Sequence, residues 1–194
     1  MVSKIDICNL ALAQLGQEPI TALTQSDERA RRLNLFYEPV KQEVLRTHNW
    51  AFAAAEEPLA LLETRNHPLP YVYQYPLDAL YIRRVFRPGE GRQNGLFREV
   101  YIQSGHLRAL KSNLPGACAE YTKNMGDEGL FDPAFVKSFS LALAADLAVA
   151  LTGDASLSRQ ILQKYTLSLD ESRRSNMSEE MTERRPSSAF VEAR

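Results

Sequence analysis

The spacing of apolar residues changes twice along this chain, and that change limits the folds that the chain can adopt. Near the N-terminus and again after residue 132, apolar residues recur three and four positions apart, which places them on one face of a helix. Between residues 71 and 123 they fall in short runs of strand-forming residues separated by glycines. The sequence therefore predicts helices at both ends of the chain with antiparallel strands between them.

Four segments carry helix signals. We expect helices over about residues 3–16, 27–47, 133–152 and 155–180. Ser3 is placed to cap the first helix, and Gly16 and Gly153 are placed to end the first and third helices in a left-handed conformation. Pro39 lies inside the second segment and should kink or split that helix, because proline lacks an amide proton and its ring meets the preceding turn.

The middle of the chain predicts a small antiparallel sheet. We expect its strands at Tyr71–Tyr75, Leu80–Phe86, Phe97–Ile102, Leu107–Leu110 and Ala117–Thr122. The segment from Ala53 to Leu62 fits either a short helix or a strand. The expected fold is mainly α within the α+β class, a helical bundle of about four helices with a small inserted antiparallel β-sheet. We expect one domain over residues 1–186 and a flexible, extended C-terminal tail over residues 187–194.

The expected core combines the helix stripes with an aromatic corner that follows the second helix. It consists of Leu12, Leu15, Leu33, Tyr37, Trp50, Phe52, Phe135, Phe139, Leu143 and Asp146. Asp146 is the charged member of this set, and a buried carboxylate needs a partner or its pKa rises. We therefore expect an ion pair between Asp146 and Arg29, Arg31 or Arg32 of the second helix.

The residue types that perform catalysis or bind metals do not form a recognisable motif. The three histidines have no paired spacing, as a metal site would require; they are His48, His67 and His106. Cys8 and Cys118 stand alone and fit small buried hydrophobes. The segment Gly89–Gly95 lacks the spacing of a phosphate-binding loop and fits a hairpin turn. We expect no catalytic residue, no metal and no cofactor.

The total charge and the apolar runs give no argument for a nucleic-acid or membrane partner. The formal net charge is −1, which by itself attracts neither. The longest apolar run, Phe139–Leu151, is shorter than the ~20 residues that span a bilayer. We expect no membrane anchor.

One stretch is nevertheless locally basic. Between Ile82 and Lys111, seven basic residues stand against two acidic ones. The basic residues are Arg83, Arg84, Arg87, Arg92, Arg98, Arg108 and Lys111. They are typical of a solvated sheet face; the alternative is a docking face for an acidic protein or a channel face for passing DNA. The aromatic residues among them are too few for a platform that stacks single-stranded bases.

The order of several short motifs resembles the tail tubular protein A family, the head-to-tail adaptors of short-tailed bacteriophages. The similar segments are Asn9–Gly16, Asp27–Arg32, Trp50 with Phe52, Tyr75–Asp78 and Leu130–Phe135. They are followed, as in that family, by a polar fourth helix and a C-terminal tail. The resemblance covers nearly the full length of the chain, and Pro39 is the position that departs from it.

The resemblance implies a structural virion protein rather than an enzyme. It implies a helical bundle with a small β region, twelve copies of which form a ring at the head–tail junction. The portal protein lies above that ring and a tail nozzle similar to tail tubular protein B lies below it. Double-stranded DNA passes through the channel without sequence-specific binding. The tail would contact the portal through Ser187, Ser188, Phe190, Val191 and Arg194, and assembly would occur in the host cytoplasm.

Two other functions remain open at this point. The first is a virion-associated cell-wall hydrolase in which an acidic residue such as Glu56 or Glu128 acts as the acid. The second is a regulatory DNA-binding module that uses the Arg83–Lys111 stretch, although no helix-turn-helix or other reading module is evident. Turnover of peptidoglycan would favour the first, and salt-dependent duplex binding would favour the second.

Overall fold

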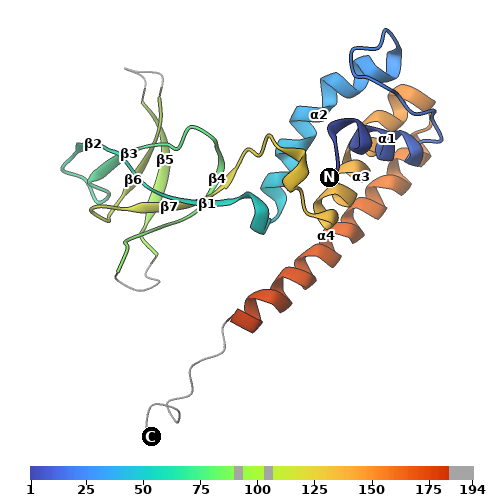
Figure 1. The fold of residues 1–194 in the computed structure, drawn as a ribbon. Helices are drawn as coiled ribbons and strands as arrows, with labels where there is room; N and C mark the ends of the chain where they lie inside the picture. The colour runs from blue at the N-terminus through green and yellow to red at the C-terminus, as the bar shows by residue number, and fades with distance from the viewer. Residues whose placement is uncertain (90–93, 103–106, 184–194) are drawn as a thin grey trace, which may run out of the picture. The chain divides into compact units, whose positions relative to one another are not determined.

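The computed structural model describes residues 1–89, 94–102 and 107–183. The chain divides into two compact units, which we call the helical unit and the β unit. Met1–Val44 and Phe131–Arg194 form the helical unit, and Leu45–Leu130 forms the β unit. Among the described residues, the helices are α1 (Lys4–Gln14), α2 (Glu28–Thr47), α3 (Pro133–Thr152) and α4 (Ala155–Glu183) (Figure 1).

Helix α1 begins and ends where its capping residues predict. The Ser3 hydroxyl accepts a hydrogen bond from the Asp6 amide, and the Asp6 carboxylate accepts one from the Ser3 amide. At the other end Gly16 adopts a positive φ of 65°. The Gly16 amide then donates to the carbonyl of Ala13, and the Gln17 amide donates to the carbonyl of Leu12. This pair of bonds is a Schellman motif, and it satisfies carbonyls that the helix leaves unpaired.

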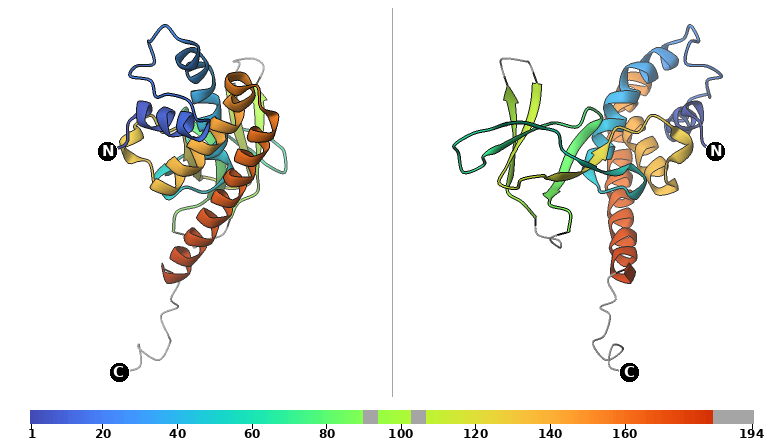
Figure 2. Two further views of the ribbon diagram at one scale, coloured as in Figure 1. Left: turned by 90° about the vertical axis from the view of Figure 1, so that its right-hand side faces the viewer. Right: turned by 60° about the vertical axis from the view of Figure 1, so that its left-hand side comes forward.

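Helix α3 is the centre of the helical unit. Asp132 caps it by accepting a hydrogen bond from the Ala134 amide at 2.7 Å, and Gly153 ends it with φ 70°. By length and composition α3 could cross a membrane, but most of it is buried inside the unit. Its fully buried Phe139 meets Tyr37 of α2 edge-to-face, with 5.0 Å between the ring centroids. Helix α4 packs along the length of α3 (Figure 2).

Helix α2 is continuous across Pro39. Of the kink or split expected at Pro39, the split is therefore wrong. Pro39 is exposed, while Tyr37, two residues before it, and Val40, directly after it, are buried. The proline ring thus faces away from the core, where the α2 backbone can adjust to it more easily.

The β unit contains two antiparallel sheets in the part of the chain that the structure describes. The first has the strand order β1 (Ala54–Pro58), β7 (Cys118–Lys123), β4 (Ala79–Phe86). The second has the order β2 (Leu61–Thr64), β3 (Tyr71–Gln74), β6 (Leu107–Ser112), β5 (Phe97–Ile102). One core joins them, with Tyr73 and Leu110 from the second sheet and Ile82, Val85 and Tyr121 from the first.

The expected fold class is wrong in its β part. The described chain is α+β, with 46% helix, 24% strand and seven strands in two sheets, rather than a helical bundle with one small sheet. Strand β1 lies in the segment that fitted either a helix or a strand. It pairs with β7, so that Ala54 lies opposite Thr122. A pairing between residues so far apart leaves no local signal, which is why the sequence did not reveal a second sheet.

Candidate functional site

An apolar groove runs between α1, α3 and α4 in the helical unit. Its volume is about 510 Å³. Leu10 of α1, Leu141 of α3 and Leu167 of α4 line it. Leu10 is 46% exposed and Leu167 is 63% exposed. Leu10 and Leu167 thus remain partly in contact with solvent above the buried Leu141, so the groove is a surface that an apolar partner can cover.

Charged side chains line the same groove. Lys137 of α3 and Glu171 of α4 form an ion pair across it, with 3.0 Å between Nζ and Oε2. Lys164 lies two turns before Glu171 on α4 and is exposed. Among the described residues Lys164 has no ion-pair partner. The groove is therefore apolar along its base and carries one uncompensated positive charge.

The serine hydroxyl groups near the groove form hydrogen bonds within the helical unit. Ser138 and Ser168 are buried and hydrogen-bond each other at 2.9 Å between α3 and α4. Ser140 donates to the Lys137 carbonyl and Ser172 to the Ser168 carbonyl. No group of three or more metal-binding side chains occurs among the described residues. The arrangement is suited to docking by shape, apolar contact and charge.

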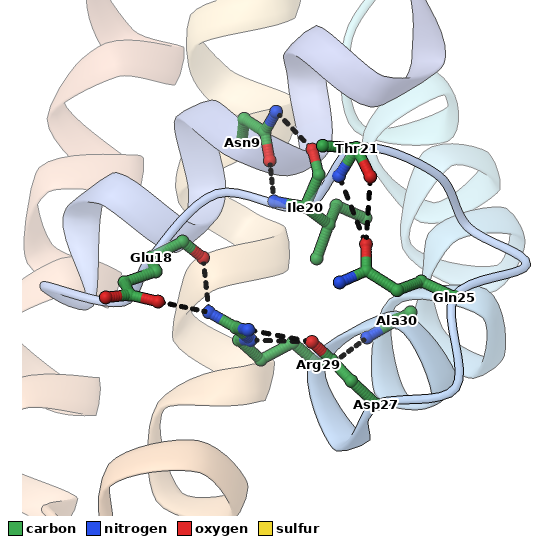
Figure 3. A network of polar contacts seen from close by, with 8 residues as sticks. All are labelled: Asn9, Glu18, Ile20, Thr21, Gln25, Asp27, Arg29 and Ala30. Carbon is green, nitrogen blue, oxygen red and sulfur yellow. Dashed lines mark hydrogen bonds and ion pairs between the residues drawn. The ribbon is translucent and has the colours of Figure 1, made fainter.

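A network of polar contacts fixes the connection between α1 and α2 (Figure 3). Two segments of the family resemblance, Asn9–Gly16 and Asp27–Arg32, contribute to it. The Asn9 side chain donates to the Ile20 carbonyl and accepts from the Ile20 amide, at 3.1 and 2.9 Å. Arg29 donates to the Glu18 carbonyl and to the Asp27 carboxylate. Asp27 also accepts a hydrogen bond from the Ala30 amide and thereby caps α2.

The electrostatics of this network favour its charged form. The hydrogen bond from Arg29, then the bond from the Ala30 amide, hold the pKa of Asp27 below its usual range. Arg29 in turn has its pKa raised, chiefly by the same hydrogen bond. Asn9, Asp27 and Arg29 therefore hold the α1–α2 connection in place, which gives Arg29 of the Asp27–Arg32 motif a structural role.

The ion pairs expected for Asp146 are not formed. Arg29 pairs with Asp27 and Glu18, while Arg31 and Arg32 both pair with Glu28. Asp146 itself is exposed, so its assignment to the core is wrong. The partial burial of its carboxyl group, and then the negative charge of Glu43, raise the pKa of Asp146. Each arginine instead finds a carboxylate close by in the sequence.

The other predicted core residues are buried, with one exception. Leu12, Leu15, Leu33, Tyr37, Trp50, Phe135, Phe139 and Leu143 are each at most 6% exposed. Phe52 is half-buried and stacks at a tilt on Trp50. Cys8 is buried as expected, whereas Cys118 is half-buried, and burial raises the pKa of its thiol.

The basic stretch does not form one continuous face. Arg83, Arg84 and Arg87 belong to β4 or follow it, whereas Arg98 is on β5 and Arg108 and Lys111 are on β6 of the other sheet. Arg92 lies outside the described residues, as do His106 and most of the Gly89–Gly95 loop.

Most of these cations have partners within the β unit. Arg83 donates to the carbonyls of Leu45 and Arg46 in the last turn of α2 and, at 2.8 Å, to the carbonyl of His48, which directly follows α2. Arg84 bonds to Glu120 and Glu56, and Arg108 bonds to Glu99 at 3.0 Å.

Arg98 and Lys111 are the described members of the stretch without a partner, and they lie opposite each other on β5 and β6. Lys111 lines a shallow hollow of about 500 Å³ with Val72 and Tyr101. The remaining charge is thus small and confined to one edge of the second sheet.

The acidic candidates for hydrolysis are not brought together. Glu56 lies on β1 and pairs with Arg84, and Glu128 lies in a short 3-10 helix at Glu128–Leu130. The described histidines, His48 and His67, lie on different segments. The portal-contact residues Ser187, Ser188, Phe190, Val191 and Arg194 lie outside the described part of the chain.

The groove residues Leu10, Lys164 and Leu167 were not predicted as functional. A weak signal existed for the leucines, because Leu10 and Leu167 fall outside the apolar stripes of their helices. Comparison of the sequence with models of known protein families finds no match, and a search of curated proteins also finds no match. The family resemblance therefore rests on the order of the sequence motifs.

Proposed function

We propose that this protein is a structural head-to-tail adaptor of a short-tailed bacteriophage. Twelve copies would form a ring between the portal protein and the tail nozzle and would extend the channel through which DNA leaves the capsid. The proposal starts from the resemblance to the tail tubular protein A family. It assigns no chemical reaction to the protein.

The observation that carries this proposal is the apolar groove of the helical unit. Leu10 and Leu167 lie partly exposed in one groove rather than singly on the surface, and an apolar surface of this kind indicates a protein partner. A closed ring requires that every copy presents such a surface to the next one. The groove would be such a surface. Its side chains come from three helices that pack together, so its shape is fixed by the fold.

The charge distribution of the β unit is compatible with DNA that slides past the ring. Strong binding of duplex DNA needs many free cations that contact phosphates. Arg84 and Arg108 are instead bonded to carboxylates within the β unit. In the proposed ring, the few free cations, such as Arg98 and Lys111, would leave DNA weakly held and able to move.

Mixing the purified chain with its cognate portal and imaging the product by electron microscopy tests this proposal. The expected product is a portal with an annulus of added density whose copies follow the portal symmetry. A chain shortened by deletion of residues 187–194 should dock more weakly, because the tail is proposed to supply the portal contact. Portals that recruit no annulus from the full chain would overturn the adaptor function, while equal docking of both chains would overturn only the role of the tail.

A further inference from the structure

The helical unit carries a second exposed surface, formed by Glu43 of α2 with Asp146 and Val149 of α3, which we call the acidic face. Glu43 and Asp146 are both exposed. Asp146 follows Phe139 by seven residues, or about two helical turns, so it lies on the side of α3 that contacts α2 through Phe139 and Tyr37. The charge of Glu43 on α2 reaches the Asp146 carboxylate. Neither carboxylate forms an ion pair with any described residue. Val149 is 53% exposed and follows Asp146 by three residues, so it lies on the same side of α3. The acidic face thus has two uncompensated negative charges and an apolar side chain.

The acidic face and the groove lie on opposite sides of α3. Lys137 lines the groove, and Asp146 follows it by nine residues. Nine residues correspond to two and a half turns at about 3.6 residues per turn, so the two side chains leave the helix in opposite directions. A contact that joins the groove of one copy to the acidic face of another would use two different surfaces, and contacts of that type form closed rings when the rotation per copy is correct.

The two surfaces also match in charge and polarity. In the groove the Lys137–Glu171 pair is neutral and Lys164 is left uncompensated. On the acidic face Glu43 and Asp146 are uncompensated. Opposite charges on two surfaces that meet raise the rate and specificity of association, whereas like charges prevent it. The free cation and the free carboxylates thus occur on the surfaces that a ring would bring together.

We propose that the groove between α1, α3 and α4 binds the acidic face of a second copy of this chain. Lys164 meets Asp146 and Glu43 of the neighbouring copy, and Val149 covers Leu167. This inference rests on the proposed ring and names its subunit contact. A second copy is the partner that fits best, because the chain itself supplies both complementary surfaces on opposite sides of one helix, as a ring contact requires.

A charge exchange tests the contact. The variants are Lys164→Glu, Asp146→Lys and the chain with both changes, each mixed with the cognate portal and imaged as the wild type is. Each single change places like charges in the contact and should lower the yield of complete rings about tenfold or more. The double variant recreates an opposite pair and should restore the yield to within about twofold of wild type.

A control variant separates local charge from total charge. Arg159→Glu changes the net charge by the same amount on the same helix, five residues from Lys164 and therefore turned away from it. It should form rings as the wild type does. All variants are first checked by circular dichroism for a wild-type helix content, since the exchanged side chains are exposed.

The outcomes distinguish the contact from the function. If wild-type chains form rings and both single variants do so equally well, the proposed contact is wrong and the adaptor function stands. Single variants that fail without rescue by the double variant would also overturn the pairing of Lys164 with Asp146. If wild-type chains form no ring on the portal, the adaptor function fails and the contact fails with it.

Discussion

At the scale of single residues, the Asn9 side chain holds the α1–α2 connection by two hydrogen bonds to the backbone of Ile20, which is 2% exposed. Asn9→Ala leaves the Ile20 amide and carbonyl without these partners. We expect it to lower the free energy of unfolding by about 1–3 kcal/mol, measured by urea denaturation. Asn34→Ala is the matched control, because Asn34 makes one exposed bond, to Leu23; equal losses in both variants would contradict the role of Asn9.

The stability of the folded chain should depend on pH through the carboxyl group of Asp146. Its pKa is raised in the folded chain, by partial burial and then by Glu43, whereas in the unfolded chain it ionises near pH 4. The folded state is therefore favoured while Asp146 is protonated, and stability is lost as the pH rises through its titration range. Asp146→Asn should melt at a higher temperature than wild type at neutral pH, with the difference vanishing below about pH 4.

Asp154 supplies a control of the opposite sign. It caps α4 by accepting hydrogen bonds from the Ser156 and Leu157 amides, and these bonds lower its pKa. Asp154→Ala should therefore be less stable than wild type at neutral pH, and the difference should shrink as the pH falls through the titration of Asp154. A lower melting temperature for Asp146→Asn at neutral pH would instead indicate that Asp146 has a stabilising partner after all.

At the scale of elements, α3 carries the packing of the helical unit through Phe139, which is fully buried against the rings of Tyr37 and Phe135. Phe139→Ala removes a ring from a filled core and leaves a cavity. We expect a loss of about 3–5 kcal/mol in the free energy of unfolding. Val149→Ala on the exposed side of the same helix should cost about 0.5 kcal/mol or less. Similar losses for both would show that α3 is not packed as described.

The helices and the strands differ in how far the sequence could predict them. Helix signals are local: Ser3 and Gly16 mark the ends of α1, Gly153 marks the end of α3, and the structure confirms each of them. Sheet formation depends on residues far apart in the chain. Strand β1 becomes recognisable only when Cys118–Lys123 lies beside it, so the expectation of a single small sheet was wrong.

The candidate site was harder to predict than the fold for a related reason. The groove combines Leu10, Leu141 and Leu167 from three helices, and each residue alone is an ordinary leucine in a helical pattern. The basic stretch had the opposite problem, because its charges are adjacent in the sequence. Folding distributes them between two sheets and pairs Arg84 and Arg108 with glutamates. Residues that are close in sequence thus suggested a basic surface that the fold divides. Residues that are far apart in sequence form the groove, which the sequence therefore did not predict.

At the scale of the whole molecule, the chain builds its helical unit from two segments, Met1–Val44 and Phe131–Arg194, with the β unit between them. Helix α1 precedes the β unit in the sequence, whereas α3 and α4 follow it. Both α1 and α4 pack against α3, and the groove lies where the three helices meet. In the proposed adaptor ring, other copies of the chain would cover the groove that these three helices leave on the surface of the helical unit.

The adaptor function and its subunit contact are tested together by electron microscopy of the full chain mixed with its cognate portal. We expect an annulus of repeated copies on each portal, which is lost in the Lys164→Glu variant and regained when Asp146→Lys is added. Portals that stay bare at saturating concentrations of wild-type chain would contradict both.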